Sequence, residues 1–274
     1  IPGLRKPTKE CQVEKVETFN VNISGDKPFY RGITILPNDR VMLVDKTNKQ
    51  CILLNNSHQV VTHYKLTGNL CDICMVSDEE VAVSVYDQKQ IQILSVRDDV
   101  ISPVRTITTK YKCYGITRAG KGEMVVVEYC GNYKYSWSLI RDGIEVNYSD
   151  QYYSSSQYFN YIAMNNSKTR VYVTVPNKNF LRCFNMEGKK QHIYSHDNLK
   201  WPVGVAVDRD DNIYVVGCHS HNIHQLSPEG CLIKVITTRV PKYPQAICFY
   251  NNSDTFVITN CSDEGENVHI FQLK

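Results

Sequence analysis

Short apolar runs separated by clusters of turn-forming residues recur along almost the whole chain. The run Gly204–Val207 is followed by the turn formers Asp208–Asn212, and Ile213–Val216 and Ile223–Leu226 supply two more apolar runs. Ser227–Gly230 then ends the series, because proline lacks a backbone donor and glycine accepts a positive φ. This pattern predicts short β-strands joined by tight turns. No stretch keeps a 3.6-residue apolar period, so we expect helices to be nearly absent.

The same unit recurs six times. Its first strands begin at positions 32, 72, 115, 161, 204 and 246, which gives spacings of 40, 43, 46, 43 and 42 residues. A period in this range, with four short strands per unit, is typical of propeller blades. The sequence therefore predicts an all-β fold: a single-domain, six-bladed β-propeller of four-stranded antiparallel blades.

The two ends of the chain complete each other in this scheme. The sixth unit has only three strands and ends with Val268–Leu273, whereas the alternating segment Val16–Ile23 belongs to no unit. Pairing the two would complete the last blade and leave it without an open edge. We therefore assign residues 1–14 as a linker and residues 15–274 as the propeller. Because the chain begins at Ile1, we expect it to be a piece of a longer protein.

The amino-acid composition indicates the cellular compartment of the protein more clearly than its function. Charged residues make up 22% of the chain and the net charge is +3, which neither requires nor excludes a nucleic-acid partner. No apolar run is long enough to span a bilayer, and no signal-peptide core is present. The 11 cysteines are spread out, and several lie inside apolar runs, where a thiol behaves as a small buried hydrophobe. A reduced, cytoplasmic protein is favoured over a disulfide framework.

Six N-x-S/T sequons run against that interpretation. They begin at Asn22, Asn55, Asn147, Asn165, Asn251 and Asn260. Several fall in expected hairpin turns, where Asn and Ser are favoured for their backbone tolerance. We therefore interpret them as turn chemistry rather than glycosylation sites, and a secreted, glycosylated scaffold remains an alternative.

The fifth unit resembles the NHL repeat. Its matching residues are Pro202, Gly204, Val205, Ala206, Val207, Asp208, Asn212, Ile213, Tyr214, Val215 and Ile223, whereas Gly217 and Asn222 replace the usual Asp and Arg. The first unit matches more loosely, and the other four keep mainly the apolar skeleton. The resemblance implies the C-terminal domain of a tripartite-motif (TRIM-NHL) ubiquitin ligase, in which such propellers bind RNA hairpins or protein targets.

Strand direction sorts the loops onto two faces. The connections between blades and the second-to-third loops share one face, and the first-to-second and third-to-fourth turns share the other. The first set is rich in aromatic and basic residues, and we expect it to form the ligand-binding face. The candidate residues are Tyr30, Arg31, Lys46, Lys112, Tyr114, Tyr133, Lys134, Tyr158, Phe159, Lys178, Lys200, Trp201, Lys242 and Tyr243.

Two kinds of partner fit this composition. Rings interleaved with cations suit single-stranded RNA, because each ring that stacks on a base contributes about 1–3 kcal/mol and Lys and Arg contact phosphates. Exposed Tyr and Trp also anchor protein interfaces. The structural alternative is that the rings fill gaps between blades and the lysines are an ordinary solvated rim. We expect a monomeric propeller with no membrane contact, although the parent chain could oligomerise through other segments.

The sequence gives little support for metal or catalytic chemistry. Cys218–His224 (CHSHNIH) looks like a metal cluster, but alternating strand residues diverge, and Cys71-x-x-Cys74 has no second pair. Standard catalytic motifs are absent. Calcium-dependent lactonases and some lyases also use six-bladed propellers, and Glu128 and Asp208 are possible ligands in such a scheme. We nevertheless expect no cofactor and no catalytic site in this segment.

Overall fold

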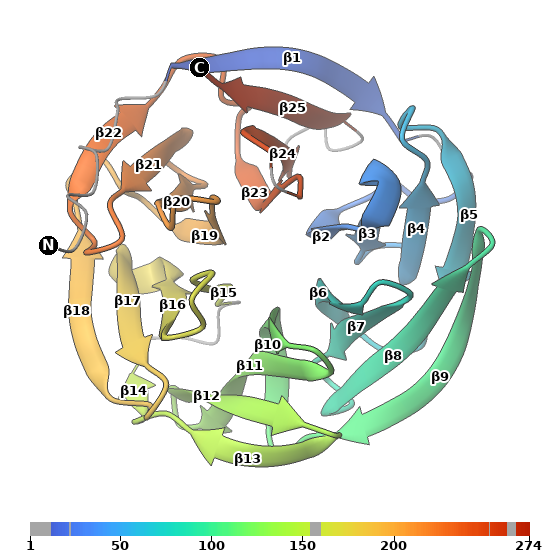
Figure 1. Cartoon of the computed structure of the whole chain (residues 1–274), viewed down its shortest axis with the longest axis horizontal. Helices are drawn as coiled ribbons and strands as arrows, with labels where there is room; N and C mark the ends of the chain where they lie inside the picture. The colour runs from blue at the N-terminus through green and yellow to red at the C-terminus, as the bar shows by residue number, and fades with distance from the viewer. Residues whose placement is uncertain (1–11, 22, 154–159, 252, 262–266) are drawn as a thin grey trace, which may run out of the picture.

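The structure is a computed structural model, which describes residues 12–21, 23–153, 160–251, 253–261 and 267–274. Six antiparallel sheets surround a central axis (Figure 1), which confirms the predicted propeller. Blade 1 contains β2 (Tyr30–Ile35), β3 (Val41–Asp45), β4 (Gln50–Leu54) and β5 (Val60–Lys65). Blade 2 contains β6 (Leu70–Ser77), β7 (Glu80–Val85), β8 (Gln90–Arg97) and β9 (Val100–Thr108). Blade 3 contains β10 (Lys112–Gly120), β11 (Glu123–Gly131), β12 (Lys134–Arg141) and β13 (Ile144–Tyr148).

The remaining blades follow the same plan. Blade 4 contains β15 (Ile162–Met164), β16 (Arg170–Val175), β17 (Phe180–Asn185) and β18 (Lys190–Ser195). Blade 5 contains β19 (Pro202–Val207), β20 (Ile213–Gly217), β21 (Asn222–Leu226) and β22 (Leu232–Ile236). Blade 6 contains β23 (Pro244–Phe249), β24 (Thr255–Asn260), β25 (Asn267–Leu273) and, as its outer strand, β1 (Val13–Asn20).

The N-terminal strand closes the ring. β1 pairs antiparallel with β25, from Val13 opposite Leu273 to Asn20 opposite Asn267. This confirms the expected closure, although the strand begins and ends three residues earlier than the segment Val16–Ile23. Residues 13–14, expected in the linker, thus belong to β1, and residues 1–11 lie outside the described residues. Phe19 also stacks on His58 of blade 1, with ring centroids 4.4 Å apart, so the closing strand contacts the next blade as well.

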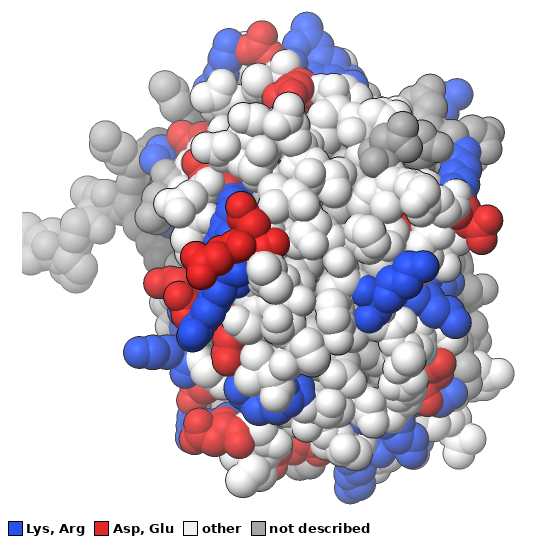
Figure 2. All heavy atoms as spheres, turned by 90° about the vertical axis from the view of Figure 1, so that its right-hand side faces the viewer, with Lys and Arg blue, Asp and Glu red and all other residues white. Residues whose placement is uncertain are grey.

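Burial follows strand position within each blade. β3 and β4 of blade 1 are buried at every residue, because their sheet packs against a neighbouring blade on each side. β5, on the rim, contains only exposed and half-buried residues. Figure 2 shows the rim of the ring at the right-hand side of Figure 1, where most atoms belong to uncharged residues and separate clusters of Lys, Arg, Asp and Glu lie among them. Val60, Val100 and Val104 of β5 and β9 are exposed aliphatic residues.

Two features of the described residues were not predicted. A short strand, β14 (Tyr152–Tyr153), pairs with the start of β12, with Lys134 opposite Tyr153. Two single-turn 3₁₀ helices, η1 (Pro37–Asp39) and η2 (Pro176–Lys178), are the helical elements found in the described ranges. Neither they nor any other helix there is long and apolar enough to cross a membrane.

Two of the sequons hold turns, as expected. The side-chain carbonyl of Asn165 accepts hydrogen bonds from the N–H groups of Thr169 and Arg170, at 2.9 and 2.8 Å. Asn165 itself is only 5% exposed. Asn55 likewise accepts the N–H of Ser57 at 3.0 Å. These contacts explain the Asn side chains at the β15–β16 and β4–β5 turns.

Candidate functional site

The innermost strands of all six blades line a central cavity of about 230 Å³. Its lining runs from the middle of β2, β6, β10, β15, β19 and β23 to their carboxyl ends, where the chain enters the first-to-second turns. The cavity therefore lies toward the turn face, opposite the face of the inter-blade connections. Most lining residues are apolar, and the charged ones are Asp72 and Arg118.

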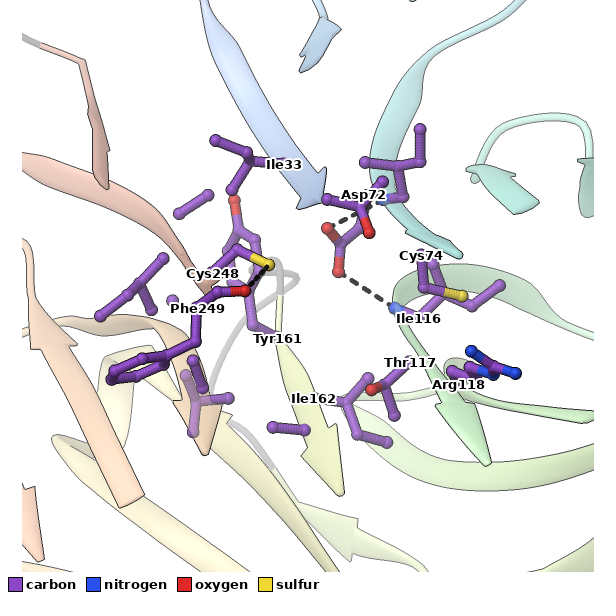
Figure 3. A pocket seen from close by; sticks show the side chains of 18 of the residues that line it. Ile33, Asp72, Cys74, Ile116, Thr117, Arg118, Tyr161, Ile162, Cys248 and Phe249 are labelled. Atoms are coloured by element: carbon purple, nitrogen blue, oxygen red, sulfur yellow. Dashed lines mark hydrogen bonds between the residues drawn. The ribbon is translucent and has the colours of Figure 1, made fainter. Parts of the chain in front are cut away.

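Asp72 projects toward the middle of this cavity (Figure 3). Its carboxylate accepts the N–H of Ile73 at 2.9 Å and the N–H of Ile116, in the next blade, at 3.1 Å. Burial raises the pKa of Asp72 to about 7, against the opposing effects of these two hydrogen bonds and of the nearby Arg31 guanidinium. The carboxyl group thus ties blade 2 to blade 3 and changes its charge near neutral pH.

Three predicted site residues lie in the interior. Tyr30, Arg31 and Tyr114 are 1%, 4% and 2% exposed, so they cannot contact a ligand at the surface. The Tyr30 hydroxyl donates to the carbonyl of Val21 at 3.0 Å, and the carbonyl of Arg31 accepts the hydroxyl of Tyr161 at 2.8 Å. These side chains fill space between blades, which is the structural alternative that the sequence left open.

The other predicted residues divide by exposure. Lys46, Lys112, Lys134 and Trp201 are half-buried, and Tyr133, Lys178, Lys200, Lys242 and Tyr243 are exposed. Tyr158 and Phe159 lie outside the described residues. All three half-buried lysines of this set place their ammonium groups over rings: Lys46 at 5.8 Å from the centroid of Phe29, Lys112 at 5.9 Å from Tyr86 and Lys134 at 5.7 Å from Tyr153.

The structure assembles four rings where blades 5 and 6 meet on the connection face. Trp201 stacks on His219 with centroids 4.8 Å apart and planes 16° apart. The ring of Tyr243 meets His221 edge-on at 4.6 Å and lies 6.4 Å from His219. We call Trp201, His219, His221 and Tyr243 the ring platform. His219 is exposed and Tyr243 is 42% exposed, so the platform is open to a partner.

The two large rings occupy equivalent backbone positions. Trp201 and Tyr243 each lie between a lysine and a proline, in Lys200-Trp201-Pro202 and Lys242-Tyr243-Pro244, and their φ values are +53° and +50°. A bulky residue in this left-handed region is a genuine outlier, with a strain of order 1–3 kcal/mol. Such strain persists only where the surroundings enforce it, and it clusters at functional sites.

Matching hydrogen bonds enforce both conformations. The N–H of Trp201 donates to the side-chain carbonyl of Asn179 at 2.8 Å, and the N–H of Tyr243 donates to Nδ1 of His221 at 3.0 Å. On the other side, the carbonyl of Trp201 accepts the N–H of Cys218 at 3.0 Å, and that of Tyr243 accepts the N–H of Cys261 at 2.9 Å. Each ring residue is therefore fixed between the second-to-third loops of two successive blades.

Three exposed lysines surround the platform. Lys200 and Lys242 directly precede its large rings, and Lys178 directly precedes Asn179, which holds Trp201. None of the ion pairs seen among the described residues involves these three lysines. The arrangement combines open rings with available cations.

Sequence reasoning missed the histidines of this platform. In the sequence His219 and His221 look like part of a metal cluster, and His221 also matches the His of the NHL repeat, whereas in the structure their rings pack on Trp201 and Tyr243. The repeated Lys-aromatic-Pro triplet, 42 residues apart, was a signal in the sequence that could have identified the two rings as a pair. The histidines could not be found this way, because only the fold brings the second-to-third loop beside the inter-blade connection.

The side chains of Cys218–His224, which look like a metal cluster in the sequence, do not converge. His224 is buried in blade 5, where its Nδ1 lies 2.7 Å from the hydroxyl of Tyr194, away from the platform. The carboxylate of Asp208 accepts the N–H groups of Asp210 and Asn212 and thereby holds the β19–β20 turn. In the part of the chain that the structure describes, no three His, Cys, Asp or Glu side chains are placed to hold a metal ion.

Comparison with solved structures shows the fold. Virginiamycin B lyase from Staphylococcus aureus, crystallised as an inactive variant with quinupristin, is 15% identical, with a TM-score of 0.65 over 97% of this chain and 100% of that chain. A Bacteroides thetaiotaomicron protein of unknown function is 12% identical, with a TM-score of 0.73 over 96% of this chain and 76% of that one. A β-propeller domain from Myceliophteria thermophila is 10% identical, with a TM-score of 0.67 over 96% of this chain and 100% of that domain.

No family model and no curated protein matches the chain. At these identities the similar structures share an architecture that serves many unrelated functions. What the chain shares with them is therefore the propeller itself.

Proposed function

We propose that this chain is a non-catalytic recognition module that binds its target on the connection face, through the ring platform. The observation that carries the proposal is the pair of Lys-aromatic-Pro triplets, whose rings are held in the same strained conformation on adjacent blades. A rigid scaffold that presents pre-positioned rings lowers the entropic cost of binding.

Single-stranded RNA is the target that the platform favours. Trp201 and Tyr243 offer ring faces on which bases can stack. Lys200 and Lys242 directly precede these two rings, and Lys178 directly precedes Asn179, which holds Trp201, so their ammonium groups can contact the phosphates of a strand bound there. The resemblance of the fifth unit to the NHL repeat agrees with this role. On that basis, the chain would act as the target-recognition domain of a TRIM-like ubiquitin ligase, in the cytoplasm.

The test measures binding of a fluorescein-labelled, randomised single-stranded RNA. Substituting Trp201→Ala or Tyr243→Ala should weaken the affinity roughly 5- to 150-fold, which corresponds to the 1–3 kcal/mol of one stacked base. Tyr153→Ala is the matched control, because this ring is 63% exposed on blade 3 and lies outside the platform. An equal loss in the control would contradict the assignment of the site to the platform.

Charge-reversal variants and the salt dependence of the binding affinity distinguish an RNA target from a protein target. If RNA binds, Lys200→Glu and Lys242→Glu should weaken binding and reduce its dependence on salt, because fewer counterions are released. Lys112→Glu and Lys134→Glu should have smaller effects, since those ammonium groups already lie over Tyr86 and Tyr153. Affinity that does not change with salt would count against RNA and favour a protein target, for which the same rings would serve as anchors.

A further inference from the structure

A pair of thiols lies directly beneath the ring platform. Sγ of Cys218, in blade 5, is 3.9 Å from Sγ of Cys261, in blade 6. The two residues occupy equivalent places, because each follows the second strand of its blade and donates its N–H to the carbonyl of a platform residue, Trp201 or Tyr243. Cys218 is 4% exposed and Cys261 is half-buried, so an external reagent reaches Cys261 first.

We propose that Cys218 and Cys261 are a site of reversible oxidation, at which a disulfide joins blades 5 and 6 and fixes the separation of Trp201 and Tyr243. The effect of the disulfide on target binding rests on the proposed function, whereas the oxidation of the two thiols does not. A disulfide needs the two sulfurs to approach to about 2.05 Å, roughly 2 Å closer than they are in the reduced structure.

The reaction follows ordinary thiol–disulfide exchange with a small disulfide such as oxidised glutathione. The Cys261 thiolate attacks one sulfur of oxidised glutathione, forms a mixed disulfide and releases one glutathione thiolate, which takes up a proton. The Cys218 thiolate then attacks Sγ of Cys261, which closes the intramolecular disulfide and releases the second glutathione. Two protein thiols are oxidised and one glutathione disulfide is reduced to two thiols.

Local contacts assign the roles of the two cysteines. The Cys218 thiol lies within hydrogen-bonding distance of the Cys261 sulfur, and this contact lowers the pKa of Cys261. The same contact, together with burial, raises the pKa of Cys218. The more exposed sulfur is therefore the attacking one and the buried sulfur resolves the mixed disulfide. The other described cysteines are also unpaired, and among them Cys231 is exposed.

The experiment treats the chain with oxidised glutathione, blocks the remaining thiols with N-ethylmaleimide and maps the peptides by mass spectrometry. A peptide that joins Cys218 to Cys261 is expected, and dithiothreitol should remove it. Cys218→Ser should instead accumulate glutathione on Cys261, and Cys261→Ser should leave Cys218 unmodified. Cys231→Ser is the matched control and should keep the cross-link. Wild-type protein that carries glutathione on Cys261, or that leaves both thiols free, overturns the proposal.

Two further readouts test the consequence for the fold and the platform. Closing a loop of 43 residues should raise the midpoint of thermal unfolding by roughly 5–15 °C in the oxidised protein. In a Trp137→Phe background, which removes the buried tryptophan, oxidation should reduce acrylamide quenching of Trp201 fluorescence. Unchanged quenching in the cross-linked protein would show that the disulfide does not reach the platform.

These readouts need no RNA or protein partner. The cross-link should still form in a Trp201→Ala, Tyr243→Ala double variant, whose rings are gone but whose backbone contacts remain. Failure of the platform to bind a target would therefore leave the oxidation result standing, and absence of the cross-link would leave the binding result standing.

Discussion

Three residues of this propeller have energetically unfavourable environments or backbone conformations. Asp72 keeps a carboxyl group in an apolar cavity, and Trp201 and Tyr243 hold backbone conformations that their side chains disfavour. In each case a hydrogen bond between a backbone N–H on one blade and a side chain on the adjacent blade compensates part of the cost. The strained and electrostatically unusual residues thus lie at contacts between blades rather than inside a blade.

The first prediction concerns the pH dependence that Asp72 confers. Its pKa in the folded chain, about 7, is raised above the ordinary value, so the folded state binds its proton more tightly. The resulting stability is fully present below about pH 4 and is lost as the pH rises through about 7. Because one pKa unit corresponds to about 1.4 kcal/mol, the free energy of unfolding of the wild type should fall relative to that of Asp72→Asn by roughly 2 kcal/mol between pH 5 and 7.

Urea denaturation at pH 5, 6, 7 and 8 measures this difference. Asp210→Asn, a change at an exposed acid in the β19–β20 turn, serves as the control and should follow the wild-type profile. Parallel profiles for the wild type and Asp72→Asn would show that the Asp72 carboxyl does not titrate in this range.

At the scale of elements, alternate inner strands approach their neighbours through glycine. A Cβ on Gly32, Gly115 or Gly204, in blades 1, 3 and 5, would lie 2.9 Å or less from a backbone atom of the following blade. Blades 2, 4 and 6 present Asp72, Tyr161 and Ala246 at these contacts. The glycines therefore let the innermost strands lie close enough to form the walls of the cavity.

The second prediction tests this close contact. In Gly204→Ala the new methyl group would meet the carbonyl oxygen of Gln245 at 2.5 Å, and backbone cannot easily move away. The substitution should lower the free energy of unfolding by roughly 1–3 kcal/mol, the usual cost of overpacking. Chemical denaturation measures it.

Gly120→Ala is the control for that substitution. There the new methyl group would meet only the end of the flexible Glu123 side chain, at 2.9 Å, so the change should cost much less. Equal effects at the two positions would show that contact between blades is not the cause.

At the scale of the whole molecule, stability depends on closing the ring. β1 covers the outer edge of β25, and it lies opposite Val268 and Phe271, which are fully buried. The N-terminal strand thus connects the two ends of a fold in which each blade otherwise packs mainly on its sequence neighbours.

The third prediction is that a chain beginning at Val21 is strongly destabilised. Losing β1 uncovers apolar side chains and leaves the edge of β25 unpaired, which should cost roughly 3 kcal/mol or more and promote association between molecules. Thermal unfolding and size-exclusion chromatography measure the two effects. A chain beginning at Gln12 retains β1 and should behave as the full chain does; if both truncations unfold alike, closure by β1 is not what stabilises the ring.

The sequence by itself determined the number of blades, the order of their strands and the closure by the N-terminal segment. These follow from local patterns, since strand periodicity and turn residues repeat every 40–46 positions. The structure alone decided which rings are available. Tyr30 and Tyr114 lie near the starts of inner strands much as Trp201 and Tyr243 do but are buried, and His219 and His221 join the ring platform from another loop. Exposure and proximity depend on how adjacent blades pack, and that packing involves residues too distant in the chain for a local pattern to record.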